Sequence, residues 1–407
     1  MGRRFVAAFG ALVLTGAAMG CGSDDNGGSG SAAAGDKTPL RIALITPTSG
    51  PLAVFGKDAV NGWQLAADEV NAKGGIDGHK VELITSDTDT NPARTVRAAR
   101  RAVTQDKAQY ISGVFTSPEN GALQQQLPSM NAISINAIAQ DDSLTGDNCS
   151  PNAFRLVQNA SMNSALIAES LSKLPAKKWA IIAADYNTGH TAAENFKAGV
   201  EKNGGTVVAE QFSPLGTTEY GSYISKLKNA DADGLFMYVI GADAPAFINQ
   251  AAQFKLFDQY KTVLGQNVVS EPLFEALGKT VVGFYNNLGY SPTIDTPRNQ
   301  AFVDAYKAKY GKDPYYVPAD NYVGALALFE AVRKAESVDP AKVRTALNGL
   351  TFESLDGQVS IRAEDHQALR KNYLGQVVEN GDSLGWKITD EVDSSVSTPQ
   401  PNPDCKL

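Results

Sequence analysis

The sequence predicts an α/β protein built from two doubly wound units in tandem. Short apolar stretches of strand length alternate with stretches of helical periodicity over residues 41–115, and the same alternation starts again after Phe154. Such alternation predicts parallel sheets whose crossover helices cover their faces. The chain of 407 residues is long enough for two domains of ordinary size.

In the first unit, three apolar strands frame two helices. The predicted strands cover residues 41–45, 81–85 and 110–115. The first helix, residues 57–72, carries its apolar side chains near one face and stops at a glycine pair. The second helix, residues 91–104, has Pro92 in its first turn, where a missing N–H is tolerated.

The second unit repeats this rhythm. Its predicted strands cover residues 180–184, 206–209 and 234–239, and its predicted helices cover residues 191–203, 220–229 and 243–254. In doubly wound sheets, ligands bind outside the carboxyl ends of the strands. We therefore expect a ligand site in the cleft between the two units.

The start of the chain predicts an export signal. An apolar run, residues 5–18, follows two arginines and is too short to span a bilayer as a permanent helix. Residues 18–21, Ala-Met-Gly-Cys, resemble the lipobox of bacterial lipoproteins, which are cut before the cysteine and diacylated on its thiol. We expect a signal peptide over 1–20, a lipid on Cys21 and a flexible linker over 21–38. The alternative is an ordinary cleaved signal followed by a chance cysteine.

Composition and charge narrow the class of protein. Hydrophobic residues make up 43% and charged residues 20% of the chain, which is typical of a globular protein. A formal net charge of −8 argues against nucleic acid and a polybasic membrane surface as partners. The three histidines and three cysteines form no cluster of metal ligands, so no metal and no cofactor are expected.

Two cysteines remain if Cys21 carries a lipid. Cys149 and Cys405 would then be an even pair in an oxidising compartment. A disulfide between them would pin a proline-rich tail, residues 399–407, to the body of the protein. Two unpaired thiols are the alternative.

Two motifs near the start of the first unit indicate a family. Residues 45–56 read Ile-Thr-Pro-Thr-Ser-Gly-Pro-Leu-Ala-Val-Phe-Gly, and residues 70–78 read Val-Asn-Ala-Lys-Gly-Gly-Ile-Asp-Gly. They resemble the leucine/isoleucine/valine-type substrate-binding proteins of bacterial ABC importers, and the resemblance extends over residues 40–390. It implies the type I periplasmic binding protein fold, in which two Rossmann-like lobes are joined by three crossovers and close over a ligand.

The resemblance also implies lobe boundaries and partners. It places the crossovers near Leu156, Asn286 and Leu355. The N-terminal lobe would comprise residues 39–156 and 287–355, and the C-terminal lobe residues 157–286 and 356–398. The implied partner is an ABC permease, and the binding protein is expected to be a monomer. We expect the lipid to be its only membrane anchor, which would hold it on the outer face of the cell membrane, or in the periplasm of a two-membrane bacterium.

Four candidate ligand-binding residues come from the same resemblance. Ser117 precedes Pro118 after a strand, so it reads as the N-cap of a helix whose start suits a carboxylate. Ala139 and Gln140 match the family's Ala-Thr segment, which holds the same carboxylate, and Gln140 replaces the hydroxyl with an amide. Phe55 matches an aromatic that covers the ligand. The alternatives are that Ser117 only caps the helix, that Gln140 is an ordinary loop residue, and that Phe55 packs within its lobe.

Three further positions bear on the size and charge of the ligand. Thr188 and Gly241 stand where relatives carry aromatic residues. The smaller side chains of this protein would enlarge the pocket. Asn267 stands where relatives that bind α-amino acids often place Glu or Asp opposite the ammonium. Burying an ammonium without a counter-charge is costly. An aromatic or other non-amino carboxylic acid is therefore the alternative to a branched-chain or related amino acid.

Two other functions compete on the same fold. An enzyme would need a nucleophile with a base, or a carboxylate pair; the sequence has no Gly-x-Ser-x-Gly, and residues 188–191 are its only suggestive cluster. We expect no enzyme. A ligand-binding sensor would have to act through a partner. Residues 365–367, Asp-His-Gln, resemble a segment shared by close relatives, and the sequence assigns them no role.

Overall fold

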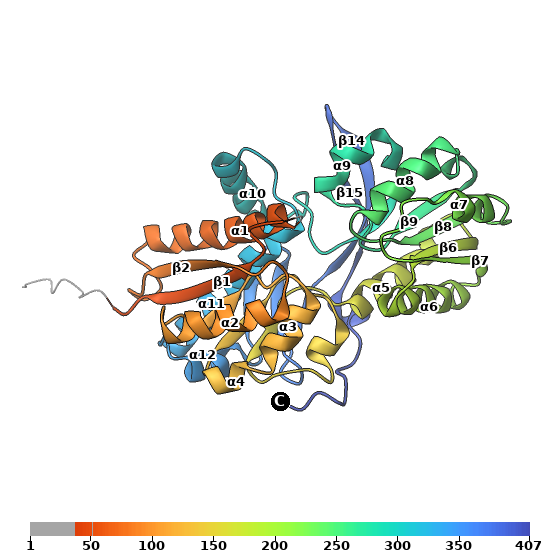
Figure 1. Cartoon of the computed structure of the whole chain (residues 1–407). Coiled ribbons are helices and arrows are strands. Elements are labelled where there is room, and N and C mark those ends of the chain that lie inside the picture. Colours follow the sequence, from red (N-terminus) through yellow and green to blue (C-terminus); the bar gives the residue numbers. More distant parts are fainter. Residues whose placement is uncertain (1–36, 51) are drawn as a thin grey trace, which may run out of the picture. The chain divides into compact units, whose positions relative to one another are not determined.

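The computed structural model describes residues 37–50 and 52–407, shown in Figure 1. The predicted signal peptide, Cys21 and nearly all of the predicted linker lie outside the described residues. The described part contains a five-stranded, a seven-stranded and a three-stranded sheet. No helix in this part of the chain is long and apolar enough to cross a membrane.

The five-stranded sheet forms the centre of the first lobe. Its order is β2-β1-β3-β4-β5, and every neighbouring pair is parallel. The strands are β1 (Leu40–Thr46), β2 (Val81–Asp87), β3 (Tyr110–Ser112), β4 (Ile133–Asn136) and β5 (Ala153–Arg155). The helices between them are α1 (Ala53–Ala72), α2 (Pro92–Thr104), α3 (Ser117–Gln124) and α4 (Leu127–Met130). Both predicted helices are present, and the predicted strand 110–115 ends earlier because Gly113 has a φ of +78°.

A later segment of the chain completes the first lobe. It comprises α10 (Pro297–Tyr310), α11 (Tyr316–Ala335), α12 (Pro340–Leu347), β11 (Thr351–Ser354), β12 (Gly357–Ile361) and β13 (Ala368–Leu369). Helix α11 packs closely on α1. The two helices approach so closely at Gly62 that a Cβ there would lie 2.2 Å from the carbonyl oxygen of Pro318. The buried Trp63 indole donates to Ser112 (3.2 Å) and Asn321 (3.1 Å), so it ties α1 to β3 and α11.

The seven-stranded sheet forms the second lobe, in the order β15-β14-β10-β9-β8-β6-β7. Its parallel strands are β6 (Lys178–Ala184), β7 (Thr206–Ser213), β8 (Gly234–Tyr238), β9 (Thr262–Gly265) and β10 (Tyr285–Leu288). An antiparallel hairpin, β14 (Asn372–Asn380) and β15 (Ser383–Val392), adds the remaining edge. The strands and helices predicted for this unit are all present.

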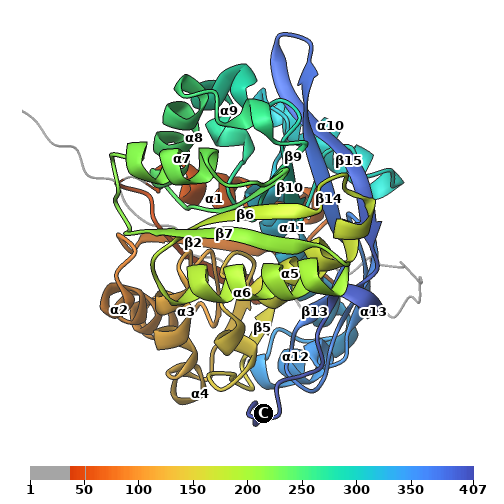
Figure 2. The same ribbon diagram turned by 90° about the vertical axis from the view of Figure 1, so that its right-hand side faces the viewer.

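Helices cover both faces of this second sheet. Helices α5 (Ala160–Ser170) and α6 (Asn187–Lys202) lie on one face, and α7 (Gly221–Lys228), α8 (Asp243–Gln253) and α9 (Phe274–Leu277) lie on the other (Figure 2). A last helix, α13 (Ser394–Ser397), follows the hairpin. Short 3-10 turns occupy Asp142–Thr145, Leu171–Lys173, Phe257–Gln259, Glu271–Leu273 and Gly278–Val281.

The chain passes between the two lobes three times before its tail. The first passage follows β5 at Leu156. Asn286 lies inside β10, so the second passage starts after Leu288. Leu355, where the resemblance places a crossover, lies in the turn between β11 and β12, which pair as an antiparallel hairpin. The third passage lies between β13 and β14.

The predicted disulfide is confirmed. Cys149 and Cys405 are bonded, with their Cα atoms 5.5 Å apart. The chain before Cys405 is also held by hydrogen bonds, since Arg362 donates to the carbonyl of Pro399 (2.8 Å) and Asn372 donates to the buried Ser397 (2.8 Å). The chain is therefore held at two places shortly before the bridge.

Residues 365–367, which the sequence assigns no role, hold the end of β5. The His366 ring stacks on Phe154 at 4.0 Å between centroids and contacts the Ala153 carbonyl oxygen at 3.1 Å. The buried Arg155 guanidinium donates to Gln367 Oε1 (2.6 Å), and Asp365 pairs with a neighbouring arginine. These contacts give the segment a structural role beside the first passage.

Candidate functional site

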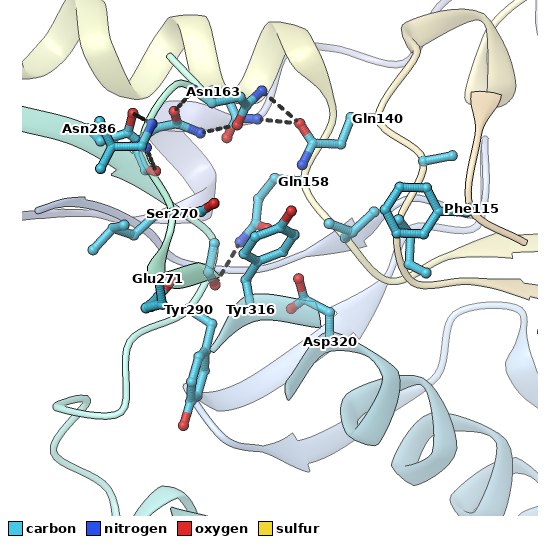
Figure 3. A pocket seen from close by; sticks show the side chains of 18 of the residues that line it. Phe115, Gln140, Gln158, Asn163, Ser270, Glu271, Asn286, Tyr290, Tyr316 and Asp320 are labelled. Atoms are coloured by element: carbon cyan, nitrogen blue, oxygen red, sulfur yellow. Dashed lines mark hydrogen bonds between the residues drawn. The ribbon is translucent and has the colours of Figure 1, made fainter. Parts of the chain in front are cut away.

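A cavity of about 330 Å³ lies between the lobes, against the chain passages (Figure 3). The first lobe lines it with the turns that follow β3 and β4 and with the start of α11. The second lobe contributes the loop after β9, the end of β10 and Asn163 of α5. The first two passages add Gln158 and Gly289. Ser117, Ala139, Gln140 and Asn267, four of the predicted ligand residues, are among the lining residues.

The start of α3 faces this cavity, but Ser117 is not its cap. Thr116 is the N-cap, and it forms a capping box with Glu119: the Thr116 side chain accepts from the Glu119 N–H, and the Glu119 carboxylate accepts from the Thr116 N–H. Ser117 is the first helical residue. Its hydroxyl accepts from the N–H of Asp141 at 3.4 Å. The N–H of Ser117 belongs to the first turn, where the helix itself supplies no acceptor.

Polar groups of Ala139 and Gln140 have hydrogen-bond partners within the protein. The Asn136 side chain accepts from the Ala139 N–H (2.9 Å) and donates to the Ala139 carbonyl (3.0 Å), so this backbone is already paired. Gln140 Oε1 accepts from Asn163 (3.0 Å) and Asn267 (3.1 Å), both on the second lobe. Gln140 therefore bridges the lobes, and within the described chain no residue accepts from its Nε2.

Asn267 belongs to a chain of side-chain amides rather than standing free. Its backbone has a φ of +57°, a conformation that asparagine tolerates better than most residues. Its N–H donates to Asn287 Oδ1 (2.8 Å), and its own Oδ1 accepts from Asn287 Nδ2 (2.9 Å). With Nδ2 committed to Gln140, every polar group of the side chain has a protein partner.

Two carboxyl groups that sequence reasoning missed line the cavity, Glu271 and Asp320. Burial raises the pKa of Glu271 to about 7. Burial also raises the pKa of Asp320 to about 6, although the Arg370 guanidinium opposes that shift. The sequence signal for Asp320 is a carboxylate in the second turn of α11, where all the other residues of the first three turns are uncharged. Glu271 lies in a 3-10 turn and has no comparable signal.

The buried Arg370 links Asp320 to the chain passages. Its guanidinium donates to Asp320 Oδ1 (2.6 Å) and to Asp356 Oδ2 (3.0 Å), and all three side chains are fully buried. The same guanidinium donates to the carbonyl of Leu156 at 3.1 Å. Arg370 itself stands in the third passage, so this cluster joins the first and third passages directly behind the cavity wall.

Three predicted ligand residues lie outside the cavity lining. Phe55 packs against Phe115 and Tyr315, with ring centroids 5.7 and 6.4 Å apart, so it stands behind Phe115, which does line the cavity. Thr188 lies in the first turn of α6, and Gly241, with a φ of +60°, lies in the turn before α8. Both turns follow carboxyl ends of strands in the second lobe. Contact of these three residues with a ligand stays a prediction.

Comparison with known proteins finds relatives along almost the whole described chain. A family model described as periplasmic binding protein matches residues 39–382. The "Leu/Ile/Val-binding protein homolog 7" of Brucella suis is 29% identical over 332 residues, which are 77% of this chain and 82% of the relative. The "homolog 8" of Brucella abortus is 29% identical over 366 residues, 84% of this chain and 89% of the relative.

Solved structures show the same architecture. A solute-binding protein of an ABC transporter from Rhodopseudomonas palustris BisB5, in complex with 3,4-dihydroxybenzoic acid, is similar with a TM-score of 0.78 and 26% identity. An ABC transporter substrate-binding protein from Sphaerobacter thermophilus is similar with a TM-score of 0.80 and 26% identity. Each match covers 88% of this chain and 98% of the other. The two-lobed α/β fold and the matched segment together show that this chain belongs to the periplasmic binding protein family.

Proposed function

We propose that this protein is the extracytoplasmic substrate-binding component of an ABC importer and that it captures a small carboxylate between its lobes. The cavity carries the proposal, because side chains from both lobes and from the chain passages line it. A ligand that touches both lobes binds their closed arrangement better than the open one, and closure is the signal a permease can read. The proposed form is a monomer.

The start of α3 is the proposed carboxylate site. Ser117 offers a hydroxyl and a first-turn N–H at the cavity wall, and the positive end of the helix dipole favours an anion there. Gln140 adds its Nε2 group from the neighbouring turn. No lysine or arginine lines the cavity in the described chain. Neutral donors therefore hold the carboxylate.

The relatives support two ligand classes. Two relatives are named as Leu/Ile/Val-binding protein homologues, which favours a branched-chain amino acid. Two of the similar solved structures hold 3,4-dihydroxybenzoic acid and 4-hydroxybenzoate, which favours a hydroxylated aromatic acid. Both classes carry a carboxylate and a second hydrogen-bonding group, which is the ammonium on the neighbouring carbon in an amino acid and a ring hydroxyl in a hydroxybenzoate.

Calorimetry with purified protein tests this function. We expect at least one branched-chain amino acid or hydroxybenzoate to bind, and Ser117→Ala to weaken that ligand about tenfold because one hydrogen bond to a charged group is lost. Ser129→Ala is the matched control, since Ser129 is exposed and bonds only the nearby Gln126 carbonyl. Failure of every carboxylate to bind, or equal affinity of wild type and Ser117→Ala, would contradict the proposal.

The lipid anchor is a second part of the proposal. The confirmed disulfide fits an oxidising, extracytoplasmic compartment. Cys21→Ser should release the protein from the membrane fraction of cells that express it. Equal membrane fractionation of Cys21→Ser and wild type would show that the anchor is elsewhere.

A further inference from the structure

Two buried oxygens of residues that line the cavity, each an acceptor rather than a hydroxyl, have no hydrogen-bond partner among the described residues. They are Asp320 Oδ2 and Gln158 Oε1. Asp320 is 0% exposed and Gln158 is 1% exposed. A buried acceptor without a donor costs about 1–3 kcal/mol. Two such oxygens in one cavity point to a donor that a ligand supplies.

The two oxygens converge on one place in the cavity. A Cβ built on Gly289 would lie 2.7 Å from Gln158 Oε1 and 3.8 Å from Asp320 Oδ2. The absence of a side chain at Gly289 thus keeps open the space between them. Asp320 and Tyr316 both extend into this region from α11 (Figure 3).

Protein contacts fix the positions of both oxygens. The other oxygen of Asp320 accepts from Arg370 at 2.6 Å. The Nε2 group of Gln158 donates to the carbonyls of Lys371 (3.0 Å) and Gly289 (3.5 Å). Neither side chain needs to move to receive a donor, so the ordering cost of binding there is small.

The local charge favours a cation. One buried guanidinium, Arg370, stands against two carboxylates, Asp320 and Asp356, which leaves the cluster one negative charge in excess when all three are ionised. Glu271 adds another acidic group to the lining. No basic side chain of the described chain lines the cavity to compensate them.

We propose that Asp320 Oδ2 and Gln158 Oε1 form a subsite for the ammonium group of the ligand, which makes the substrate an α-amino acid. This proposal rests on the carboxylate capture proposed above. The subsite supplies, from α11 and the first passage, the counter-charge that Asn267 lacks. Burial raises the pKa of Asp320, and an ammonium beside it would restore the ionised form.

A matched pair of ligands tests the subsite. L-leucine and 4-methylpentanoate differ only in the amine, so calorimetry on the full-length, detergent-solubilised protein isolates its contribution. We expect wild type to bind leucine on the order of 100-fold more tightly than 4-methylpentanoate. Asp320→Asn should remove most of that preference and leave the affinity for 4-methylpentanoate within about threefold.

A second variant leaves the buried ion cluster intact. Gly289→Ala places a methyl group against Gln158 Oε1, so it should weaken the binding of leucine more than the binding of 4-methylpentanoate. This variant tests the subsite even if Asp320→Asn does not fold. Gly221→Ala is the control, because its Cβ meets no atom within 4 Å.

Three results would overturn the proposal. Equal loss of both ligands in Asp320→Asn would show a purely structural role for Asp320. If wild type binds 4-hydroxybenzoate more tightly than leucine and Asp320→Asn loses this preference, the subsite binds a hydroxyl group rather than an ammonium. Binding of 4-methylpentanoate as tightly as leucine would refute the ammonium subsite while leaving carboxylate capture in place, whereas failure of every carboxylate to bind would remove the proposed function itself.

Discussion

Removal of the Cys149–Cys405 bridge should destabilise the protein through its unfolded state. The native tail keeps its other anchors, the Arg362–Pro399 and Asn372–Ser397 hydrogen bonds, so only the last residues of the chain gain freedom when the bridge is broken. The unfolded chain, in contrast, loses a closed loop. The double variant Cys149→Ser, Cys405→Ser is the appropriate perturbation, because it leaves neither partner of the bridge as an unpaired thiol.

The size of the effect follows from the length of the loop. The two cysteines are 256 positions apart in the sequence. In the chain-entropy model, closing a loop of that length costs the unfolded state about 5.5 kcal/mol at 25 °C. Native strain and residual structure in the unfolded chain reduce that value, so we expect the double variant to lose about 3–5 kcal/mol.

Equilibrium unfolding in guanidinium chloride measures this loss. We expect the unfolding midpoint of the double variant to lie well below that of the oxidised wild type. Dithiothreitol should lower the unfolding midpoint of wild type, because it reduces the bridge. Dithiothreitol should leave the double variant unchanged, which controls for effects of the reductant itself. Equal midpoints for wild type and double variant would refute the entropic argument.

Three other changes have defined outcomes. Asn267→Asp replaces a donor to Gln140 with a carboxylate oxygen, so ligand affinity measured by calorimetry should fall by about 1–3 kcal/mol. His366 has a pKa lowered by burial to about 4. Below pH 6.5 this histidine takes up a proton in the unfolded protein but stays neutral in the folded protein, so the free energy of unfolding should fall by about 3 kcal/mol between pH 6.5 and pH 4. The pH dependence of unfolding, compared between wild type and His366→Asn, measures this loss. Gly62→Ala should cost about 2–4 kcal/mol of unfolding free energy because its Cβ meets rigid backbone, whereas Gly221→Ala, in open space, should be neutral or slightly stabilising.

Each of these outcomes has a contrary result. Tighter leucine binding by Asn267→Asp would place an ammonium at that residue. A constant stability difference between wild type and His366→Asn from pH 7 to pH 4 would show that the histidine does not titrate as argued. Equal stability of Gly62→Ala and Gly221→Ala would contradict the close approach of α1 and α11.

Local sequence patterns were sufficient to predict strands β1–β3 and β6–β8 and helices α1, α2 and α6–α8, because each depends on periodicity within a short window. Strands β11, β12 and β13 were not predicted, since they form a small sheet that no alternation of strand and helix indicates. The local signal for their hairpin is the Asp356-Gly357 dipeptide, where Gly357 has a φ of +92°. Turn chemistry therefore carried the information that periodicity lacked.

The site was predicted less completely than the fold. Ser117 and Gln140 line the cavity, and their contact with a ligand stays a prediction. Thr116 rather than Ser117 is the cap, and the glutamate three residues after Thr116 was the readable signal. Asp320 and Gln158 escaped prediction because their roles depend on partners far along the chain. Asp320 pairs with Arg370, and Gln158 bonds Lys371; no local pattern links these residues.

A crystal structure of the complex with leucine would test the central claim most directly. The claim predicts that the carboxylate accepts from Ser117 at the start of α3 and that the ammonium donates to Asp320 and Gln158, with Asn267 and Asn163 of the second lobe closing over the ligand. A ligand bound to one lobe alone, or bound outside the cavity, would contradict it.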